Sequence, residues 1–167
     1  MLLTGTLKLM DFGISTCIRR QVLAAGPYLM TGLTGSLRYM AKEVFLEQPY
    51  NQTVDVHSMG IIMWHIVTCS MPYPRFSRKQ FTEQVVGRDL RPPLEHLRGG
   101  QAAAGGAAGP ESVPVAQEGA LALLLQRCWA PDFRKRPDAS EVLVSISALL
   151  EEETCLHIAS SGGCCGA

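Results

Sequence analysis

The chain has 167 residues, of which 47% are hydrophobic and 18% charged, a composition typical of a folded domain with a hydrophobic core. Its fifteen basic and fifteen acidic residues cancel. This balance argues against a protein that binds nucleic acid or a membrane surface through excess positive charge. The six cysteines show no CxxC spacing, which favours free thiols in a reducing cytoplasm over a zinc site or a disulfide framework. The N-terminus shows no signal-peptide pattern.

The first predicted element is a short strand over residues 7–10, LKLM, which ends at the acid, aromatic residue and glycine of 11–13. Residues 14–38 hold little periodicity and many Gly, Thr and Ser, so we expect a long surface loop that is either functional or mobile. A short helix over residues 41–47 should follow and end at Pro49.

The longest apolar stretch is VDVHSMGIIMWHIVTC, residues 54–69. It is short for a membrane span and contains charged and histidine residues. Because residues 54–68 are apolar on nearly all sides, they predict a central buried helix with Ile62 and Ile66 in the core. The prolines of MPYP, residues 71–74, should end it.

Three further helices are expected. Residues 77–86 predict a short one, with Phe81 and Val85 on one face, and residues 116–129 predict another, with Leu121, Leu124, Leu125 and Cys128 on one stripe. A last helix should begin at the capping-box pair Asp138 and Glu141 and continue with Val142, Leu143, Ile146, Leu149 and Leu150.

The composition also predicts how the chain divides. We expect a first part over residues 1–98 and a flexible insertion over 99–115, whose GGQAAAGGAAGP cannot anchor a core. The last two helices would occupy residues 116–153, and a disordered tail residues 154–167.

Several motifs together resemble the C-terminal lobe of a eukaryotic protein kinase. They are DFG at 11–13, SLRYMAKEV at 36–44, the D-x-x-S-x-G of the central helix, and a late CW and RKRP at 128–129 and 134–137. The likeness is nearest to the serine/threonine tyrosine-kinase-like group. It implies a mainly α fold, a helical bundle around a central buried helix with a short strand before DFG, in which the N-lobe is missing.

The resemblance assigns the nucleotide site to Asp11, Phe12 and Gly13. Asp11 would hold the Mg²⁺ that bridges the phosphates of ATP, since magnesium prefers oxygen ligands. Phe12 would pack inward, and Gly13 would allow the backbone to change between active and inactive states. The alternative is an Asp-containing turn after a strand, without a ligand.

The loop that follows resembles an activation segment. Thr31 and Thr34 are candidate phosphorylation sites, where a phosphate could order the loop by pairing with arginine; the alternative is a solvated loop rich in Thr and Gly. Ser36, Arg38 and Tyr39 would form the loop that receives serine or threonine substrates.

Three residues are assigned structural roles by the resemblance. Glu43, in an APE-like triad with Lys42 in place of proline, would form a buried ion pair with Arg136; alternatively, both are surface charges. Asp55 would accept hydrogen bonds from the backbone of the catalytic loop, or could be an acid favoured by the helix dipole. His57 and His65 depart from the family pattern and are interpreted as packed residues rather than ligands or bases.

Some motifs of an active kinase are absent from the sequence: the Gly-rich loop, the strand lysine and the HRD-x-x-x-x-N catalytic loop. No residue takes the role of base. We therefore interpret the chain as part of a serine/threonine kinase, with ATP and protein substrates as partners, inactive alone and binding Mg–ATP weakly or not at all. The alternatives are a truncated product acting as a helical binding module, or a degraded kinase-like scaffold. Binding to nucleic acid or membrane is not expected.

Overall fold

A computed structural model describes residues 8–17, 32–33, 35–97 and 115–161, and within these ranges the regular elements are helical, with no strand. In chain order they are the 3₁₀ turn η1 (Leu37–Tyr39), α2 (Lys42–Phe45), α3 (Thr53–Thr68), α4 (Arg78–Gln80), the π-helical η2 (Phe81–Val86), η3 (Glu95–Leu97), α5 (Val115–Cys128), η4 (Phe133–Lys135) and α6 (Ala139–Ser161). The prediction of a mainly α fold is confirmed. None of the described helices is long and apolar enough to cross a bilayer.

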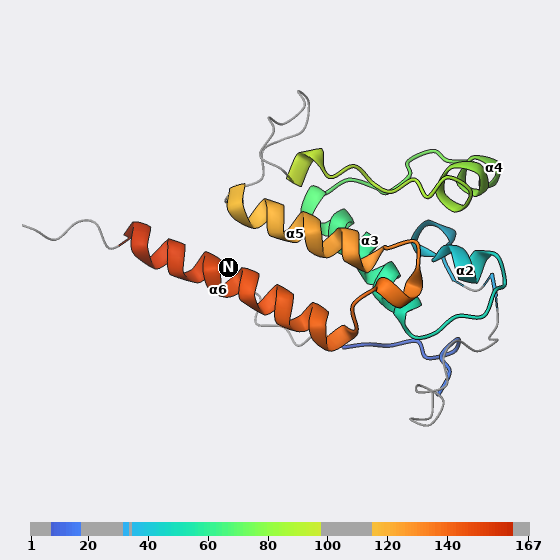
Figure 1. Cartoon of the computed structure of the whole chain (residues 1–167), viewed down its shortest axis with the longest axis horizontal. Helices are drawn as coiled ribbons and strands as arrows, with labels where there is room; N and C mark the ends of the chain where they lie inside the picture. Colours follow the sequence, from blue (N-terminus) through green and yellow to red (C-terminus); the bar gives the residue numbers. More distant parts are fainter. Residues whose placement is uncertain (1–7, 18–31, 34, 98–114, 162–167) are drawn as a thin grey trace, which may run out of the picture.

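Helix α3 lies at the centre of the bundle, with α5 packed across it and α6 antiparallel to α5 (Figure 1). The core cluster joins Ile61 and Trp64 of α3 to Leu125 and Trp129 at the end of α5. Gly60 allows this close packing, because a Cβ atom there would lie 2.8 Å from the Cβ of Cys128. The predicted central helix is therefore confirmed, and its close approach to α5 requires glycine at position 60.

The other faces of α3 differ from expectation. Ile62 is 43% exposed and Ile66 is 68% exposed, and Met59 on the same stripe is 46% exposed. The prediction that both isoleucines are core residues was wrong. The helix is apolar around its circumference, but the described neighbours cover only part of it, so one apolar stripe faces outward.

The strand predicted over residues 7–10 is also absent from the part that the structure describes. Residues 8–10 have no regular structure, and Leu9 and Met10 are 86% and 83% exposed. A strand is stable only when its backbone groups pair with a neighbour. The described residues offer no second strand, so apolar composition alone does not produce one here.

The short helices follow local sequence signals closely. Ser77 and Gln80 form a capping box at the start of α4. The chain then widens into the π-helix η2, where the backbone N–H of Gly87 donates to the carbonyl of Thr82 at 2.9 Å. Phe81 and Val85 are buried on one face of this helix, as predicted.

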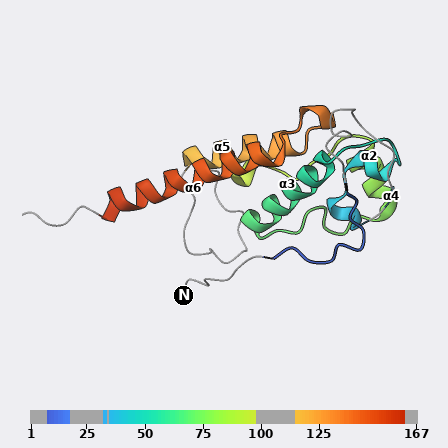
Figure 2. The ribbon, with the colours of Figure 1, turned by 90° about the horizontal axis from the view of Figure 1, so that it is seen from below.

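Helix α6 begins with the predicted capping box. The Glu141 N–H donates to Oδ1 of Asp138, and the Asp138 N–H donates to Oε2 of Glu141, both at 2.8 Å. Val142 is buried, but Leu143 and Leu150 are 65% and 57% exposed, so the apolar spacing marks the helix without burying it fully. Helix α6 continues to Ser161, beyond the expected end at residue 153, and projects past the rest of the bundle (Figure 2).

Candidate functional site

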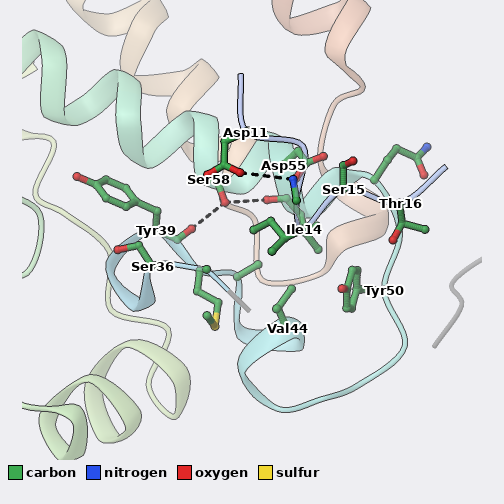
Figure 3. A pocket seen from close by; sticks show the side chains of 16 residues that line it. Asp11, Ile14, Ser15, Thr16, Ser36, Tyr39, Val44, Tyr50, Asp55 and Ser58 are labelled. Carbon is green, nitrogen blue, oxygen red and sulfur yellow. Dashed lines mark hydrogen bonds between the residues drawn. The ribbon is translucent and has the colours of Figure 1, made fainter. Parts of the chain in front are cut away.

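A cleft in the described part of the chain has a volume of about 700 Å³. Three stretches line it: the loop 11–16, the segment 35–44 that leads into α2, and residues 50–58 at the start of α3 (Figure 3). These stretches carry the DFG motif, the SLRYMAKEV motif and the first turns of the central helix. The fold thus brings together motifs that are well separated in the sequence, from residue 11 to residue 58.

Asp11 lines this cleft in an unusual backbone conformation. Its φ is 65°, the left-handed region that aspartate tolerates better than most residues. One carboxylate oxygen, Oδ1, accepts a long hydrogen bond of 3.4 Å from the backbone N–H of Gly13. The acid, rather than Gly13, therefore takes the left-handed conformation in this loop.

Phe12 does not pack inward. Its side chain is 67% exposed, and it belongs to none of the apolar clusters of the described residues. The expectation of a buried phenylalanine was wrong for this structure. Aromatic burial requires an opposing apolar surface, and the described part of the chain places none beside residue 12.

A second carboxylate, that of Asp55 in the first turn of α3, lines the same cleft as Asp11 (Figure 3). Partial burial raises the pKa of Asp55, because desolvation disfavours the charged carboxylate. The side chain remains exposed to the cleft. It is thus available to accept hydrogen bonds from backbone placed in the cleft, which is the role that the resemblance implies.

The donor set suits magnesium only in part. In the described ranges, no group of three or more His, Cys, Asp or Glu side chains is placed to hold a metal. Magnesium in phosphoryl-transfer sites commonly has one or two protein carboxylates, with waters and substrate phosphates completing its coordination. A cleft lined by Asp11 fits a metal that is held jointly with a nucleotide, and does not fit a metal held by protein alone.

The segment 35–40 is fixed by several contacts from its own side chains. Gly35 has a φ of +104°, which a residue with a side chain rarely adopts. Arg38 Nη1 donates to the carbonyls of Pro72 and Tyr73 at 2.5 and 3.0 Å. Arg38 therefore holds two parts of the backbone together, and this guanidinium is committed to carbonyls rather than open to a substrate.

Tyr39 is also held from two sides. Its hydroxyl lies 3.1 Å from Nδ1 of His65, and its carbonyl accepts a 2.9 Å hydrogen bond from Oγ of Ser58. The two rings of Tyr39 and His65 are nearly parallel, at 15°. His65 thus acts as a packed polar partner of the loop, in line with its interpretation from sequence. Ser36, between Gly35 and these anchors, is one of the residues that line the cleft (Figure 3).

The predicted contact between Glu43 and Arg136 is present. The guanidinium meets the carboxylate through two hydrogen bonds, Nη1 to Oε1 at 2.5 Å and Nη2 to Oε2 at 3.1 Å. The side chains are 4% and 0% exposed. Arg136 also donates from Nε to the Ala130 carbonyl at 3.0 Å and from Nη1 to the Thr53 carbonyl at 3.4 Å. The alternative of two surface charges is excluded.

His57 is buried where it feels the charge of Arg136 and forms a hydrogen bond with the backbone of Tyr39. It is 2% exposed, and its Nδ1 has no hydrogen-bond partner. Burial, helped by the positive charges of Arg136 and Arg91, lowers the pKa of His57 to about 3. The imidazole is therefore neutral at pH 7, a packed residue as the sequence interpretation held.

A comparison with known proteins agrees with these features. Residues 1–145 match the family described as protein kinase domain. The chain belongs to the protein kinase family.

Three relatives show which part of the kinase family is nearest. The serine/threonine/tyrosine-protein kinase HT1 of Arabidopsis thaliana is 33% identical over 81% of this chain and 28% of its own length. The dual specificity protein kinase shkE of Dictyostelium discoideum is 31% identical over 88% of this chain and 18% of its own length. The serine/threonine-protein kinase STY46 of Arabidopsis thaliana is 31% identical over 87% and 21%. The expected nearness to the tyrosine-kinase-like group is confirmed, and the chain spans less than a third of each relative.

One ion pair of this kinase chain was not predicted from sequence. Lys42, which stands where the family pattern has proline, places Nζ 2.9 Å from Oδ1 of Asp89. Arg91 Nη2 meets the same oxygen at 3.2 Å and ties the network to the Trp129 carbonyl through Nε, at 3.3 Å. The contact joins residues 47 apart, and the sequence carries no local signal for it.

Thr31 and Thr34 lie outside the described residues, as does the insertion predicted over 99–115 apart from Val115, the first residue of α5. The end of the predicted tail, residues 162–167, is also outside them.

Proposed function

We propose that this chain is the C-lobe part of a protein serine/threonine kinase that transfers the γ-phosphoryl group of ATP to protein hydroxyls. The observation that carries the proposal is that one cleft is lined by both Asp11 and Ser36. A carboxylate suited to a nucleotide-bound metal and a loop suited to an acceptor hydroxyl would then meet in one space. The relatives are named as serine/threonine, tyrosine or dual specificity kinases, which supports this reaction class.

In this proposal Asp11 would hold Mg²⁺ together with the phosphates of ATP. The metal would supply charge neutralisation at the phosphates. Ser36 would help to position the hydroxyl of a protein substrate, while Arg38 and Tyr39 keep the backbone of residues 36–39 in place through their contacts with Pro72, Tyr73, Ser58 and His65. Phosphorylation of Thr31 or Thr34 remains a proposed means of ordering the same segment.

We also propose that the 167 residues are inactive without further kinase sequence. They include no Gly-rich loop, no strand lysine and no HRD-x-x-x-x-N motif, so neither a base nor the rest of the phosphate site is supplied. The neutral charge balance and the free cysteines support a cytoplasmic protein whose partners are protein substrates and ATP.

The test is a phosphoryl-transfer assay with Mg–ATP and a mixture of serine and threonine peptides. The 167-residue chain should transfer no phosphate and should bind Mg–ATP weakly or not at all. Any longer product that the transcript encodes upstream of Met1 should be active and should lose activity when Asp11→Asn is introduced. Submicromolar Mg–ATP binding by the short chain, or an active Asp11→Asn enzyme, would contradict the proposal.

A non-catalytic binding module is the second candidate function. The outward position of Phe12 favours it, because aromatic side chains are enriched at protein–protein interfaces. The phosphoryl-transfer assay described above distinguishes the kinase from the binding module. A long product that remains inactive while folding normally would support the binding module.

A further inference from the structure

Residues 71–91 form a unit with an apolar cluster of its own. This unit, which we call the arm, consists of α4, η2 and the loops on either side of them, and it lies beside α2 at one end of the bundle (Figure 1, Figure 2). Its cluster is separate from the core between α3 and α5. The cluster consists of Tyr73, Phe81, Val85 and Val86, with the partly buried Leu37, Phe45 and Phe76 packed against them. Among the described helices other than α4, α2 packs most closely on η2, so the arm rests mainly on α2 and the loop before it.

Two cations connect the arm to residues 35–43, which we call the acceptor segment because it contains Ser36. Near the start of the segment, Arg38 donates to two successive backbone carbonyls of the arm. At the end of the segment, Lys42 Nζ lies 2.9 and 3.3 Å from the two carboxylate oxygens of Asp89. Because the acceptor segment is tied to the arm near both of its ends, its position depends on the position of the arm.

Asp89 is held in place within the arm. Its φ is 53°, a left-handed conformation that aspartate tolerates better than most residues. Arg91 Nη2 lies 3.2 Å from Oδ1 of Asp89, the same oxygen that is nearest to Lys42. The Arg91 side chain is 13% exposed and also donates to three backbone carbonyls, including that of Trp129 just after α5. Lys42 therefore contacts a carboxylate whose position is set by the arm and by the end of α5.

Lys42 stands where the family pattern has proline. A proline ring would fix φ at the first position of α2, and Ala41 before it is already extended, with a ψ of 148°. Lysine does not restrict the backbone in this way, so its contact with Asp89 supplies a restraint of a different kind. The side chains of Lys42 and Asp89 are 26% and 36% exposed, which leaves the ion pair accessible to water and salt. This restraint is therefore reversible, whereas that of a proline ring is permanent.

We propose that Lys42 and Asp89 are positioning residues for the loop that receives substrates. Their ion pair couples the acceptor segment to the arm, so that a displacement of the arm changes the placement of Ser36. The inference rests on the proposed kinase function in one respect, that Ser36 belongs to the site that receives a substrate hydroxyl. The coupling itself is a property of the folded chain and can be measured without catalysis.

The test is amide hydrogen exchange of the folded 167-residue chain, followed by NMR without nucleotide or substrate. Two amides report on each side of the ion pair, those of Tyr39 and Met40 in the acceptor segment and those of Gly87 and Leu90 in the arm. Each of the four amides donates a backbone hydrogen bond, so its exchange requires a local opening. Lys42→Met removes the charge and keeps a long side chain. It should speed the exchange of all four amides by roughly twofold to fivefold, the range that a partly exposed ion pair supplies.

Three matched variants assign the effect to the ion pair. Lys42→Arg keeps a charge that can reach Asp89 and should retain the native exchange rate at all four amides. Lys42→Pro should protect the two amides of the acceptor segment alone, because proline fixes the backbone at the start of α2 but does not reach the arm. Lys79→Met removes the same charge from an exposed pair within the arm and should change none of the four rates. Raising NaCl to about 1 M should reproduce the effect of Lys42→Met in the unaltered chain and add nothing to it in that variant.

Two results would overturn the inference. If Lys42→Met speeds exchange in α3 and leaves the four amides at their native rates, Lys42 only stabilises the fold. If Lys42→Pro protects all four amides, the ion pair is not what connects the arm to the acceptor segment. Should Lys42→Pro fail to fold, the comparison of Lys42→Met with Lys42→Arg decides. Because the experiment contains no ATP, its failure leaves the phosphoryl-transfer result untouched, and a chain that responds as expected but belongs to an inactive protein would keep the coupling and remove only its role in catalysis.

Discussion

The ion pair between Glu43 and Arg136 offers a severe test of the fold. Replacing Glu43 by Ala leaves a guanidinium that is 0% exposed without its carboxylate. Breaking a buried pair in this way costs about 3 to 5 kcal/mol, since the remaining charge has no water to replace its partner. At 2 to 4 °C per kcal/mol for a chain of this size, the melting temperature should fall by about 6 to 20 °C.

Arg136→Ala should cost at least as much. It also removes the hydrogen bonds to the carbonyls of Ala130 and Thr53, whereas Glu43→Ala leaves those in place. The double change Glu43→Leu, Arg136→Met removes both charges and keeps an apolar filling, so it should be less destabilised than either single alanine variant. Circular dichroism during heating and during urea titration measures these differences.

A surface pair provides the control. Lys79 and Glu83 are 85% and 54% exposed and 3.9 Å apart, so Lys79→Ala should change stability by less than ~0.5 kcal/mol. Unchanged melting temperatures for both Glu43→Ala and Arg136→Ala would refute the reasoning. So would a double variant that is as unstable as the sum of the two single ones, because that result would mean the residues act independently.

Three further predictions follow from individual contacts. The pKa of His57 is about 3 in the folded protein and near 6.5 when unfolded, so the unfolded chain binds a proton first as the pH falls. The free energy of unfolding should therefore be highest above pH 6.5 and should decrease by on the order of 2 kcal/mol between pH 7 and 5. His57→Phe should flatten this slope in urea titrations, and an equal slope in both proteins would show that another group titrates. Lys42→Ala should cost no more than ~1 kcal/mol, since the pair with Asp89 is partly exposed. Lys42→Pro should restore stability even in an Asp89→Asn background, because proline is favoured at the first position of a helix; a chain that unfolds on this change would show that the lysine N–H or side chain is needed. Asp138→Ala should lower stability by ~1 kcal/mol through loss of the cap on α6, with Glu141→Ala losing less, and heating curves without any shift would contradict the assigned cap.

Local signals gave most of the helical fold in advance. The central helix was expected over 54–68 and is observed over Thr53–Thr68, because a segment that is apolar on nearly all sides favours a helix inside the protein. The cap of α6 was readable because Asp138 and Glu141 are three residues apart, and such pairs act within one turn. Where the sequence repeats a local motif of the kinase family, the position of the side chain could be inferred as well.

The errors share a different cause. Ile62, Ile66 and Phe12 were expected to be buried, and each depends on an opposing surface that periodicity does not describe. The strand over 7–10 needed a partner strand for the same reason. The salt bridge between Lys42 and Asp89 joins two segments that only the tertiary packing brings together, so no sequence pattern in either segment predicts it. Sequence patterns indicate what a segment can bury, while the rest of the fold determines whether it does.

The ion pair between Glu43 in α2 and Arg136, the residue after η4, also bears on synthesis of the protein. Its two members are 93 residues apart in the chain, and α3, which lies between them, needs α5 to cover its core face. A nascent chain leaves the ribosome N-terminus first, at roughly 5 to 20 residues per second. Residues 35–97 must therefore wait outside the exit tunnel for several seconds with Glu43 unpaired and Trp64 uncovered, a period in which molecular chaperones have reason to bind them.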